Sequence, residues 1–160
     1  MSNDMFIKLD GIKGESTDDK HKGEIDVVSW TWGSSQPGGA QGQGGTGRGK
    51  AIVNDLTFTK VNDCATPVLL GMHLTGTPIK TAVLTMRKAG KTALEYTKIT
   101  MTDCIVTAVD HGGTAETVGH TETVSLMFGT VKYEYTPQNA DGSGGAVVTM
   151  GFNIKANTTM

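Results

Sequence analysis

The chain has 160 residues, a hydrophobic fraction of 37%, a charged fraction of 19% and a formal net charge of −2. This length and composition fit one globular domain, predicted over residues 1–160, and argue against a disordered chain. Scattered Lys and Arg with a slight negative charge disfavour nucleic acid as a partner, and no apolar run approaches the roughly 18 to 20 residues of a membrane span.

A first strand is predicted close to the start of the sequence. Met5, Ile7 and Leu9 recur at every second position, which gives this strand one apolar face, and Gly11 ends it. The segment that follows, residues 14–22, is polar and has neither a strand nor a helix period, so it is predicted to be an exposed loop. The sequence before this loop lacks the features of a signal peptide, so export is expected to use another route.

The predicted strand over residues 24–33 has two unlike faces. Val28, Trp30 and Trp32 share one face, and this spacing is the ordinary pattern of side chains that pack into a core. A sugar-binding platform built from the two indoles is the alternative. The opposite face carries small side chains and hydroxyls: Val27, Ser29 and Thr31.

Residues 34–50 are rich in glycine and nearly free of side chains able to pack, which predicts the longest loop of the chain. Within it, residues 44–51 come close to the phosphate-binding pattern G-x-x-x-x-G-K-[ST]. Ala51 stands where that pattern needs a hydroxyl for magnesium, and a strand-like run follows where a helix is required. Nucleotide binding is therefore disfavoured, and no cofactor is expected.

One helix is predicted over about residues 63–74, after a strand over residues 51–61. Asp63 or Thr66 can cap the N-terminus of this helix, and Gly76 can end it in the left-handed conformation. Its buried stripe is expected at positions i, i+4 and i+8, namely Cys64, Val68 and Met72.

After the helix the pattern returns to strands rich in Thr, Val, Ile and Tyr, separated by short glycine-containing turns. The apolar phase changes near Gly129, which indicates a β-bulge or bend. The predicted strands cover residues 80–88, 94–109, 122–136 and 148–156. The fold class is therefore mainly β, a small antiparallel β-barrel or sandwich with one flanking α-helix.

Several of these strands are apolar or only weakly polar on both faces. A lone barrel with one face in water does not explain this pattern, because its outer face would be polar. Neighbouring copies of the same chain would cover the second face. A closed homo-oligomer is thus the first structural inference.

Short motifs occur in a characteristic order along nearly the whole sequence. They are residues 4–8 (DMFIK), 14–16 (GES), 24–27 (EIDV), 30–33 (WTWG), 55–60 (DLTFTK), 66–67 (TP), 87–90 (RKAG), 96–100, 122–128, 135–138 (YTPQ) and 152–154 (FNI). Each motif is weak alone. Together, in this order, they resemble the haemolysin-coregulated protein (Hcp) family, the tube subunits of type VI secretion systems.

The resemblance implies a small β-barrel that assembles into hexameric rings, which stack into the inner tube of a contractile injector. It also implies that the ring lumen carries effector proteins, and that the tube meets a VgrG-like tip protein and sheath and baseplate proteins. Such a chain is not an enzyme, resides in the bacterial cytoplasm before firing and is then secreted through the machine. It would be the plain structural form, without a fused C-terminal effector domain.

The resemblance further assigns roles to two groups of residues. The hydroxyl-bearing face of the strand over residues 24–33 is expected to line the lumen, where Ser29 and Thr31 would touch effectors. The loops over residues 14–22 and 34–50 are expected to make contacts within or between rings. The candidates for these ring contacts are Glu15, Asp18, Lys20, Gln43, Arg48 and Lys50.

A rival function is a small secreted hydrolase or metal-dependent toxin that uses His111, His120 and a cysteine. The four histidines lack the spacing of a metal site, and His111 and His120 are expected to face solvent. Cys64 and Cys104 are the only cysteines and are expected to be buried thiols in a reducing cytoplasm. The sequence therefore offers no complete catalytic or metal site.

Overall fold

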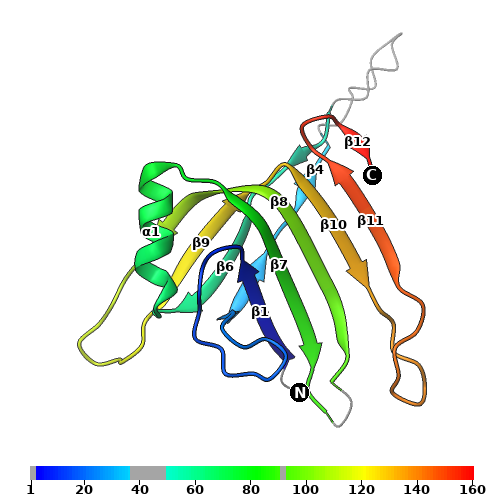
Figure 1. The fold of residues 1–160 in the computed structure, drawn as a ribbon, viewed down its shortest axis with the longest axis horizontal. Helices are drawn as coiled ribbons and strands as arrows, with labels where there is room; N and C mark the ends of the chain where they lie inside the picture. The colour runs from blue at the N-terminus through cyan, green and yellow to red at the C-terminus, as the bar shows by residue number, and fades with distance from the viewer. Residues whose placement is uncertain (1–2, 37–49, 91–92) are drawn as a thin grey trace.

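The computed structural model describes residues 3–36, 50–90 and 93–160. Strands dominate this part of the chain, and one helix lies beside them (Figure 1), which confirms the predicted fold class. The elements are β1 (Asn3–Leu9), β2 (Ile25–Asp26), β3 (Ser29–Thr31), β4 (Ser34–Ser35), β5 (Ile52–Val53), β6 (Leu56–Val61), α1 (Ala65–Thr75), β7 (Ile79–Lys88), β8 (Glu95–Asp110), β9 (Thr121–Met127), β10 (Thr130–Tyr135), β11 (Val148–Asn153) and β12 (Thr158–Thr159).

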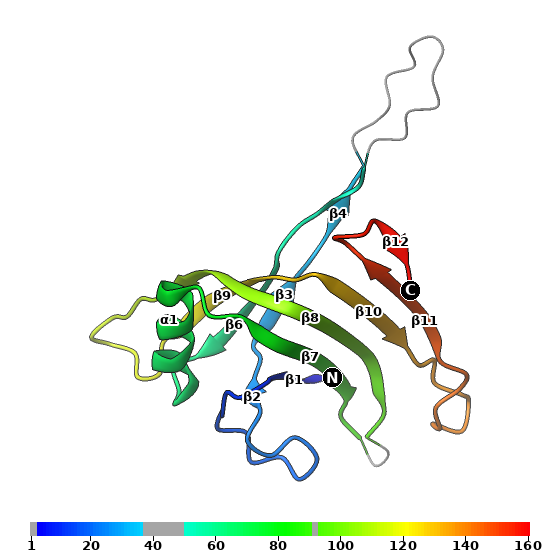
Figure 2. The ribbon, with the colours of Figure 1, turned by 45° about the horizontal axis from the view of Figure 1, so that its top comes forward.

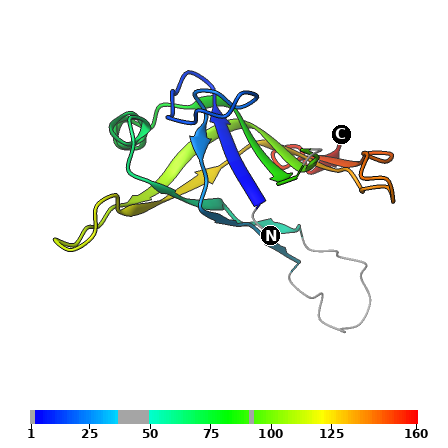
Figure 3. The ribbon, with the colours of Figure 1, turned by 90° about the horizontal axis from the view of Figure 1, so that it is seen from below.

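The central sheet closes into an antiparallel barrel. Strand β7 pairs with β1 and β8, and β9 joins the second half of β8 to β6, which in turn pairs with β3. The short segment from β2 to β3 completes the circle, because the Val27 N–H donates to the Met5 carbonyl and the Val28 N–H donates to the Thr59 carbonyl. Figure 3 shows these strands wrapped around one interior.

The core fills that interior with side chains from every wall of the barrel. Ile7 and Leu9 confirm the predicted apolar face of β1, and Trp30 and Trp32 pack against the same cluster from the β3 side. Burial of one such Leu or Ile side chain contributes about 1.5–3 kcal/mol to stability. The fully buried large residues include Ile25, Leu56, Phe58, Leu69, Leu84, Ile99, Met101 and Leu126.

The predicted strand over residues 122–136 is divided into two, as the change of apolar phase indicated. β9 lies in the barrel wall, whereas β10 continues along the first half of β8 and pairs on its other side with β11. The break falls at Gly129, where an added Cβ would lie 3.2 Å from both the Asp103 Cβ and the Lys155 Cε. Strands β10, β11 and β12 therefore extend the sheet beyond the barrel (Figures 1 and 2).

Helix α1 ends where the sequence predicted and buries a different face. Gly76 adopts φ 66° and ψ 26°, and its N–H donates to His73 while the Thr77 N–H donates to Met72, which together form a Schellman motif. The helix begins after Cys64, and its inward residues are Ala65, Thr66 and Leu69, with Met72 partly buried.

The predicted stripe is therefore wrong for Cys64 and Val68, whereas Met72 packs against the core as predicted. Cys64 precedes the first turn, and Val68 is exposed to solvent. The error has a physical cause: α1 is apolar on all sides, so its period cannot show which face packs on the barrel.

Two further expectations need correction. The strand predicted over residues 24–33 is split between β2 and β3, and Val28 at the split is exposed because Val27 points inward instead. The segment over residues 14–22 is not a fully exposed loop. It folds back on residues 23 and 24 through backbone hydrogen bonds, and Gly14, Ser16 and His21 are buried.

No helix among the described residues is long and apolar enough to cross a membrane.

Candidate assembly and cargo surfaces

The outer face of β3, β6 and β9 is lined with hydroxyl groups. The strand register places Ser29 beside Thr59 and Thr31 beside Thr57. On the other side of β6, it places Thr59 beside Thr123 and Thr57 beside Ser125 of β9. The Thr57 and Ser125 hydroxyls are hydrogen-bonded at 2.9 Å. This hydroxyl face consists of Ser29, Thr31, Thr57, Thr59, Thr123 and Ser125.

The two residues predicted to contact effectors lie on this face. Ser29 and Thr31 are exposed, while Trp30 between them points into the barrel and donates from Nε1 to the Met86 sulfur at 3.1 Å. The alternation of β3 thus puts the indole on the core side and the hydroxyls on the outside. The structure brings Thr57, Thr59, Thr123 and Ser125 into the same surface, which no single segment of sequence could reveal.

The indoles do not form an exposed platform for a sugar. Trp32 packs edge to face on Phe128, with ring centroids 5.8 Å apart, and its Nε1 donates to the Asn54 carbonyl. Both tryptophans are partly buried against the core. The prediction of core packing is confirmed.

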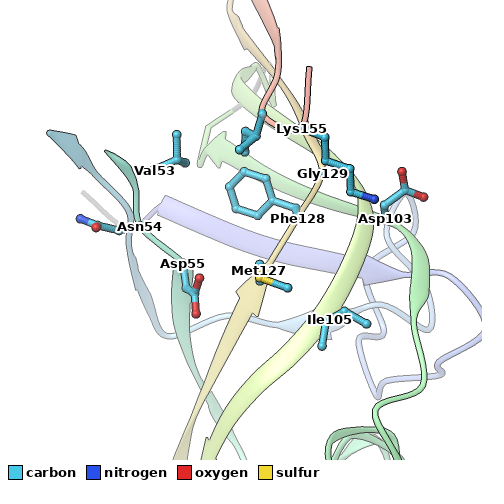
Figure 4. Close-up of a pocket in the computed structure, with 10 residues that line it drawn as sticks. Val53, Asn54, Asp55, Asp103, Ile105, Met127, Phe128, Gly129 and Lys155 are labelled. Atoms are coloured by element: carbon cyan, nitrogen blue, oxygen red, sulfur yellow. The ribbon is translucent and has the colours of Figure 1, made fainter. Parts of the chain in front are cut away.

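A shallow pocket lies where the barrel wall meets the extension of the sheet (Figure 4). Phe128 forms its centre, and the charged side chains around it are Asp55, Asp103 and Lys155. Asp55 accepts a hydrogen bond of 2.6 Å from the Thr107 hydroxyl, so this carboxylate is already engaged. The pocket lining contains neither histidine nor cysteine among the described residues.

The extension of the sheet exposes apolar side chains on one face. Tyr133 faces Met150 and Tyr135 faces Val148 across β10 and β11, so these side chains lie on the same face as Val131 and Phe152. Exposure grows with distance from the barrel: Val131 is buried, Tyr135 is 45% exposed and Val148 is 66% exposed. We call Tyr133, Tyr135, Val148, Met150 and Phe152 the apolar flap.

The flap also has an open edge. Strand β12 pairs only with Phe152 and Asn153, so among the described residues no strand lies beside β11 from Val148 to Met150. Unpaired backbone groups on an edge strand readily accept a further strand. The sequence showed that the last strand alternates, but its position at the sheet margin follows only from the pairing of β10 with β8 and β11.

The candidates for ring contacts lie in different surroundings. Glu15, Lys20 and Lys50 are exposed, and Glu15 accepts a hydrogen bond from the Cys64 backbone N–H at 3.2 Å. Asp18 is bound within its own chain, because Arg87 donates to both of its carboxylate oxygens at 3.0 and 2.5 Å. Gln43 and Arg48 lie outside the described residues.

Arg87 also donates to Asp4 at 3.0 Å. The hydrogen bonds from Arg87 outweigh desolvation and lower the pKa of Asp18 from 3.8 to about 2. Because the folded pKa is depressed, this ion pair stabilises the fold above the unfolded pKa, and the contribution is lost as the pH falls toward 2.

Substitution Arg87→Gln is expected to raise the titration midpoint of the Asp18 carboxylate from about 2 toward 3.8. Carboxyl-detected NMR on the folded protein measures this midpoint directly. Asp141 serves as the internal control, since its pKa is lowered by hydrogen bonds from Ser143 and should not respond. An Asp18 midpoint that stays near 2 in the variant would show that Arg87 is not its cause.

A buried ion pair joins the start of α1 to the barrel. Lys60 is fully buried, donates to Glu122 and to Thr66 at 2.9 Å, and forms an ion pair with Asp63 at 2.8 Å. Burial raises the pKa of Glu122, but the hydrogen bonds from Lys60, Thr66 and His111 outweigh it and leave that pKa lowered. This cluster satisfies its charges internally, which is the arrangement of a structural pair.

The residues of the rival hydrolase do not assemble into a site. His111 is exposed as predicted and bonds to Glu122, whereas His120 is only partly exposed and its Nδ1 has no hydrogen-bond partner within the described residues. Burial, and then the charge of Asp103, raise the pKa of the Cys104 thiol to about 12, which opposes its use as a nucleophile. No group of three or more His, Cys, Asp or Glu in the described part could hold a metal.

Cys104 is buried as expected, but Cys64 is exposed. The prediction of two buried thiols is therefore wrong for Cys64. Its position ahead of the helix turns its side chain toward the Lys13 carbonyl, to which the thiol donates at 3.3 Å.

Comparison with known proteins gives concordant matches over nearly the entire chain. Residues 6–135 match the family model described as type VI secretion system effector, Hcp. The chain is 45% identical over 159 residues to protein hcp1 of Pseudomonas aeruginosa, and the match covers 98% of each.

Two solved structures show the same fold. The crystal structure of Hcp1 from Salmonella typhimurium superposes with a TM-score of 0.82 at 42% identity, and the match covers 100% of both chains. A structure described as a type six secretion system protein gives a TM-score of 0.92 at 30% identity, with 99% of this chain and 100% of that chain covered.

Proposed function

The chain belongs to the Hcp family and is a structural component of the type VI secretion tube, and we propose that it forms hexameric rings that stack into this tube. A single barrel domain over residues 1–160 is the repeating unit. The protein has no catalytic role and no cofactor. It is held in the bacterial cytoplasm before firing and leaves the cell through the secretion machine.

The observation that carries this proposal is the uncovered apolar flap. Monomeric proteins rarely leave contiguous apolar side chains such as Tyr135, Val148 and Met150 in water. A cyclic ring joins one patch of each subunit to a different patch of the next, so every flap is covered once the circle closes. The open edge of β11 beside the flap would allow backbone hydrogen bonds to strengthen the same contact.

The hydroxyl face is proposed to line the lumen. Its six named side chains carry no charge, and the apolar side chains of Val61 and Met127 lie only at the ends of the same strands, so it can border a water-filled channel and still donate and accept hydrogen bonds with varied protein surfaces. Ser29 and Thr31 are then the residues that touch effector proteins. A VgrG-like tip protein and sheath and baseplate proteins are the proposed partners at the ends and outer surface of the tube.

The loops at residues 14–22 and 34–50 are proposed to contribute contacts within or between rings. Glu15, Lys20 and Lys50 have exposed side chains that suit this role. Gln43 and Arg48 are proposed from the sequence alone. Asp18 would act indirectly, because its carboxylate is engaged by Arg87.

Size-exclusion chromatography with light scattering tests the assembly. The expected mass is about six times the 16.8 kDa of one chain at micromolar concentration. A particle that stays monomeric at high concentration would refute the proposed ring.

Substitution Thr31→Lys is expected to spare the ring and impair cargo protection, because six long charged side chains would crowd the lumen. The measurement is the steady-state level of a co-expressed effector, with ring mass measured in parallel. Thr117→Lys is the matched control, since Thr117 is an exposed threonine on the loop before β9. Unchanged effector levels in a Thr31→Lys ring would contradict a lumenal position for Thr31.

A further inference from the structure

A histidine of the loop over residues 14–22 lies between two carboxylates. The His21 side chain is 9% exposed, and its Nδ1 lies 2.7 Å from Glu24 Oε2 while its Nε2 lies 2.6 Å from Glu95 Oε1. A neutral imidazole has one N–H and one lone pair, so it can donate to only one of the two carboxylates. Both contacts can be hydrogen bonds at the same time only when the cluster carries one added proton.

The imidazole of His21 also packs against an aromatic side chain. His21 stacks on Phe6 of β1 with ring centroids 4.4 Å apart and an angle of 9° between the planes. The guanidinium of Arg87 lies 5.2 Å from the centroid of the Phe6 ring. The loop is thus held on the face of β1 that points away from the core, and Glu95 of β8 is the contact most distant in sequence, 74 residues from His21.

The charges around His21 come from every element packed against it. Carboxylates outnumber cations in this cluster, so the cluster carries a net negative charge when the imidazole is neutral. The charged groups are Asp4 of β1, Asp26 of β2, Arg87 of β7, Glu95 of β8, and Asp18, Asp19, Lys20, Lys22 and Glu24 of the loop.

We propose that the contacts of His21 with Glu24 and Glu95 form a proton-dependent clasp that fastens the loop over residues 14–24 to the barrel. With the proton present, both ring nitrogens donate and the loop is closed. When the proton leaves at higher pH, one nitrogen presents its lone pair to a carboxylate, and the loop is released from Glu95.

The clasp stands on contacts within one chain and does not depend on ring formation. If the proposed contacts of Glu15 and Lys20 between subunits hold, release of the loop would weaken them, and that consequence alone rests on the proposed function. The clasp and the ring can be tested separately. Hydrogen exchange at residues 14–24 tests the clasp, and the mass of the particle tests the ring.

Hydrogen exchange with mass spectrometry tests the clasp on the full chain. Exchange at residues 14–24 is compared at about pH 6 and about pH 9, after correction for the intrinsic dependence of exchange on pH. Loss of a charge-assisted hydrogen bond predicts at least about a tenfold drop in protection at the higher pH. Peptides from β7 and β8 should keep their protection at both values.

Two variants separate the clasp from general unfolding. His21→Phe keeps an aromatic ring against Phe6 but cannot donate, so its loop should exchange rapidly at both pH values while the barrel stays protected. Glu95→Gln removes the distant carboxylate and should abolish most of the pH dependence. His73→Gln changes a histidine on α1, outside the cluster, and should behave like the unsubstituted protein.

The proposal is overturned if corrected protection of residues 14–24 in the unsubstituted protein is the same at both pH values. It is also overturned if His21→Phe keeps the pH dependence of the unsubstituted protein.

Discussion

Substitution Val148→Glu is expected to convert the ring into folded monomers. Val148 is 66% exposed in the single chain, so glutamate at this position faces water and the monomer keeps its fold. In the ring the same carboxylate would be buried without a partner at every interface. That burial costs several kcal/mol, which corresponds to association at least about 100-fold weaker.

Light scattering measures the mass of the variant, and circular dichroism shows whether it keeps its fold. The matched control is Val118→Glu, because Val118 is a fully exposed valine on the loop before β9, outside the flap. This control should keep the ring mass. Retention of the ring by Val148→Glu would show that the apolar flap is not the interface, whereas dissociation of both variants would point to a nonspecific effect of charge.

Substitution Lys60→Met is expected to cost about 3–5 kcal/mol of unfolding free energy, the largest loss predicted for this chain. Methionine fits the apolar part of the lysine side chain, so the loss comes from leaving Glu122 buried without its cation. Denaturant unfolding at neutral pH measures the change. Lys132→Met provides the control, because Lys132 pairs with Glu134 at the surface and such a pair is worth at most about 1 kcal/mol.

The double substitution Lys60→Met with Glu122→Leu distinguishes a lost charge partner from lost packing. Removal of both charges should recover much of the stability, since no carboxylate then lies buried and unpaired. Equal destabilisation by the single and double substitutions would mean that packing around Lys60 dominates. Loss below about 1 kcal/mol in Lys60→Met would mean that the pair is not a structural one.

The sequence predicted those features of the fold that are encoded locally. Gly76 ends α1 through a left-handed turn that depends only on neighbouring residues. The change of apolar phase at Gly129 separates β9 from β10, and this alternation can be followed along the sequence of each strand. The buried face of α1 could not be predicted in this way. The helix is apolar all round, and its packing against β8 makes the choice.

Buried polar groups were missed for a related reason. Lys60 is fully buried because it meets Glu122, 62 residues away, and His21 is buried because it meets Glu95, 74 residues away. From sequence alone, a charged or polar residue is predicted to be exposed unless its partner is known. Hence the loop over residues 14–22 was predicted to be exposed, although Gly14, Ser16 and His21 are buried.

The candidate surfaces were predicted unevenly. Ser29 and Thr31 were assigned to an outer face by alternation, and that face exists, enlarged by hydroxyls from β6 and β9. Their contact with effectors stays a prediction. The apolar flap was not predicted as a surface. Its exposure depends on the edge of β8 with which β10 pairs and on the short length of β11 that pairs with β12.

Electron microscopy of the purified, negatively stained protein tests the central claim most directly, because it shows the shape of the assembly as well as its size. The account predicts ring-shaped particles with sixfold symmetry and a stain-filled centre, bordered by the hydroxyl face. Compact particles without a central hole, at concentrations well above those of assembly, would contradict it.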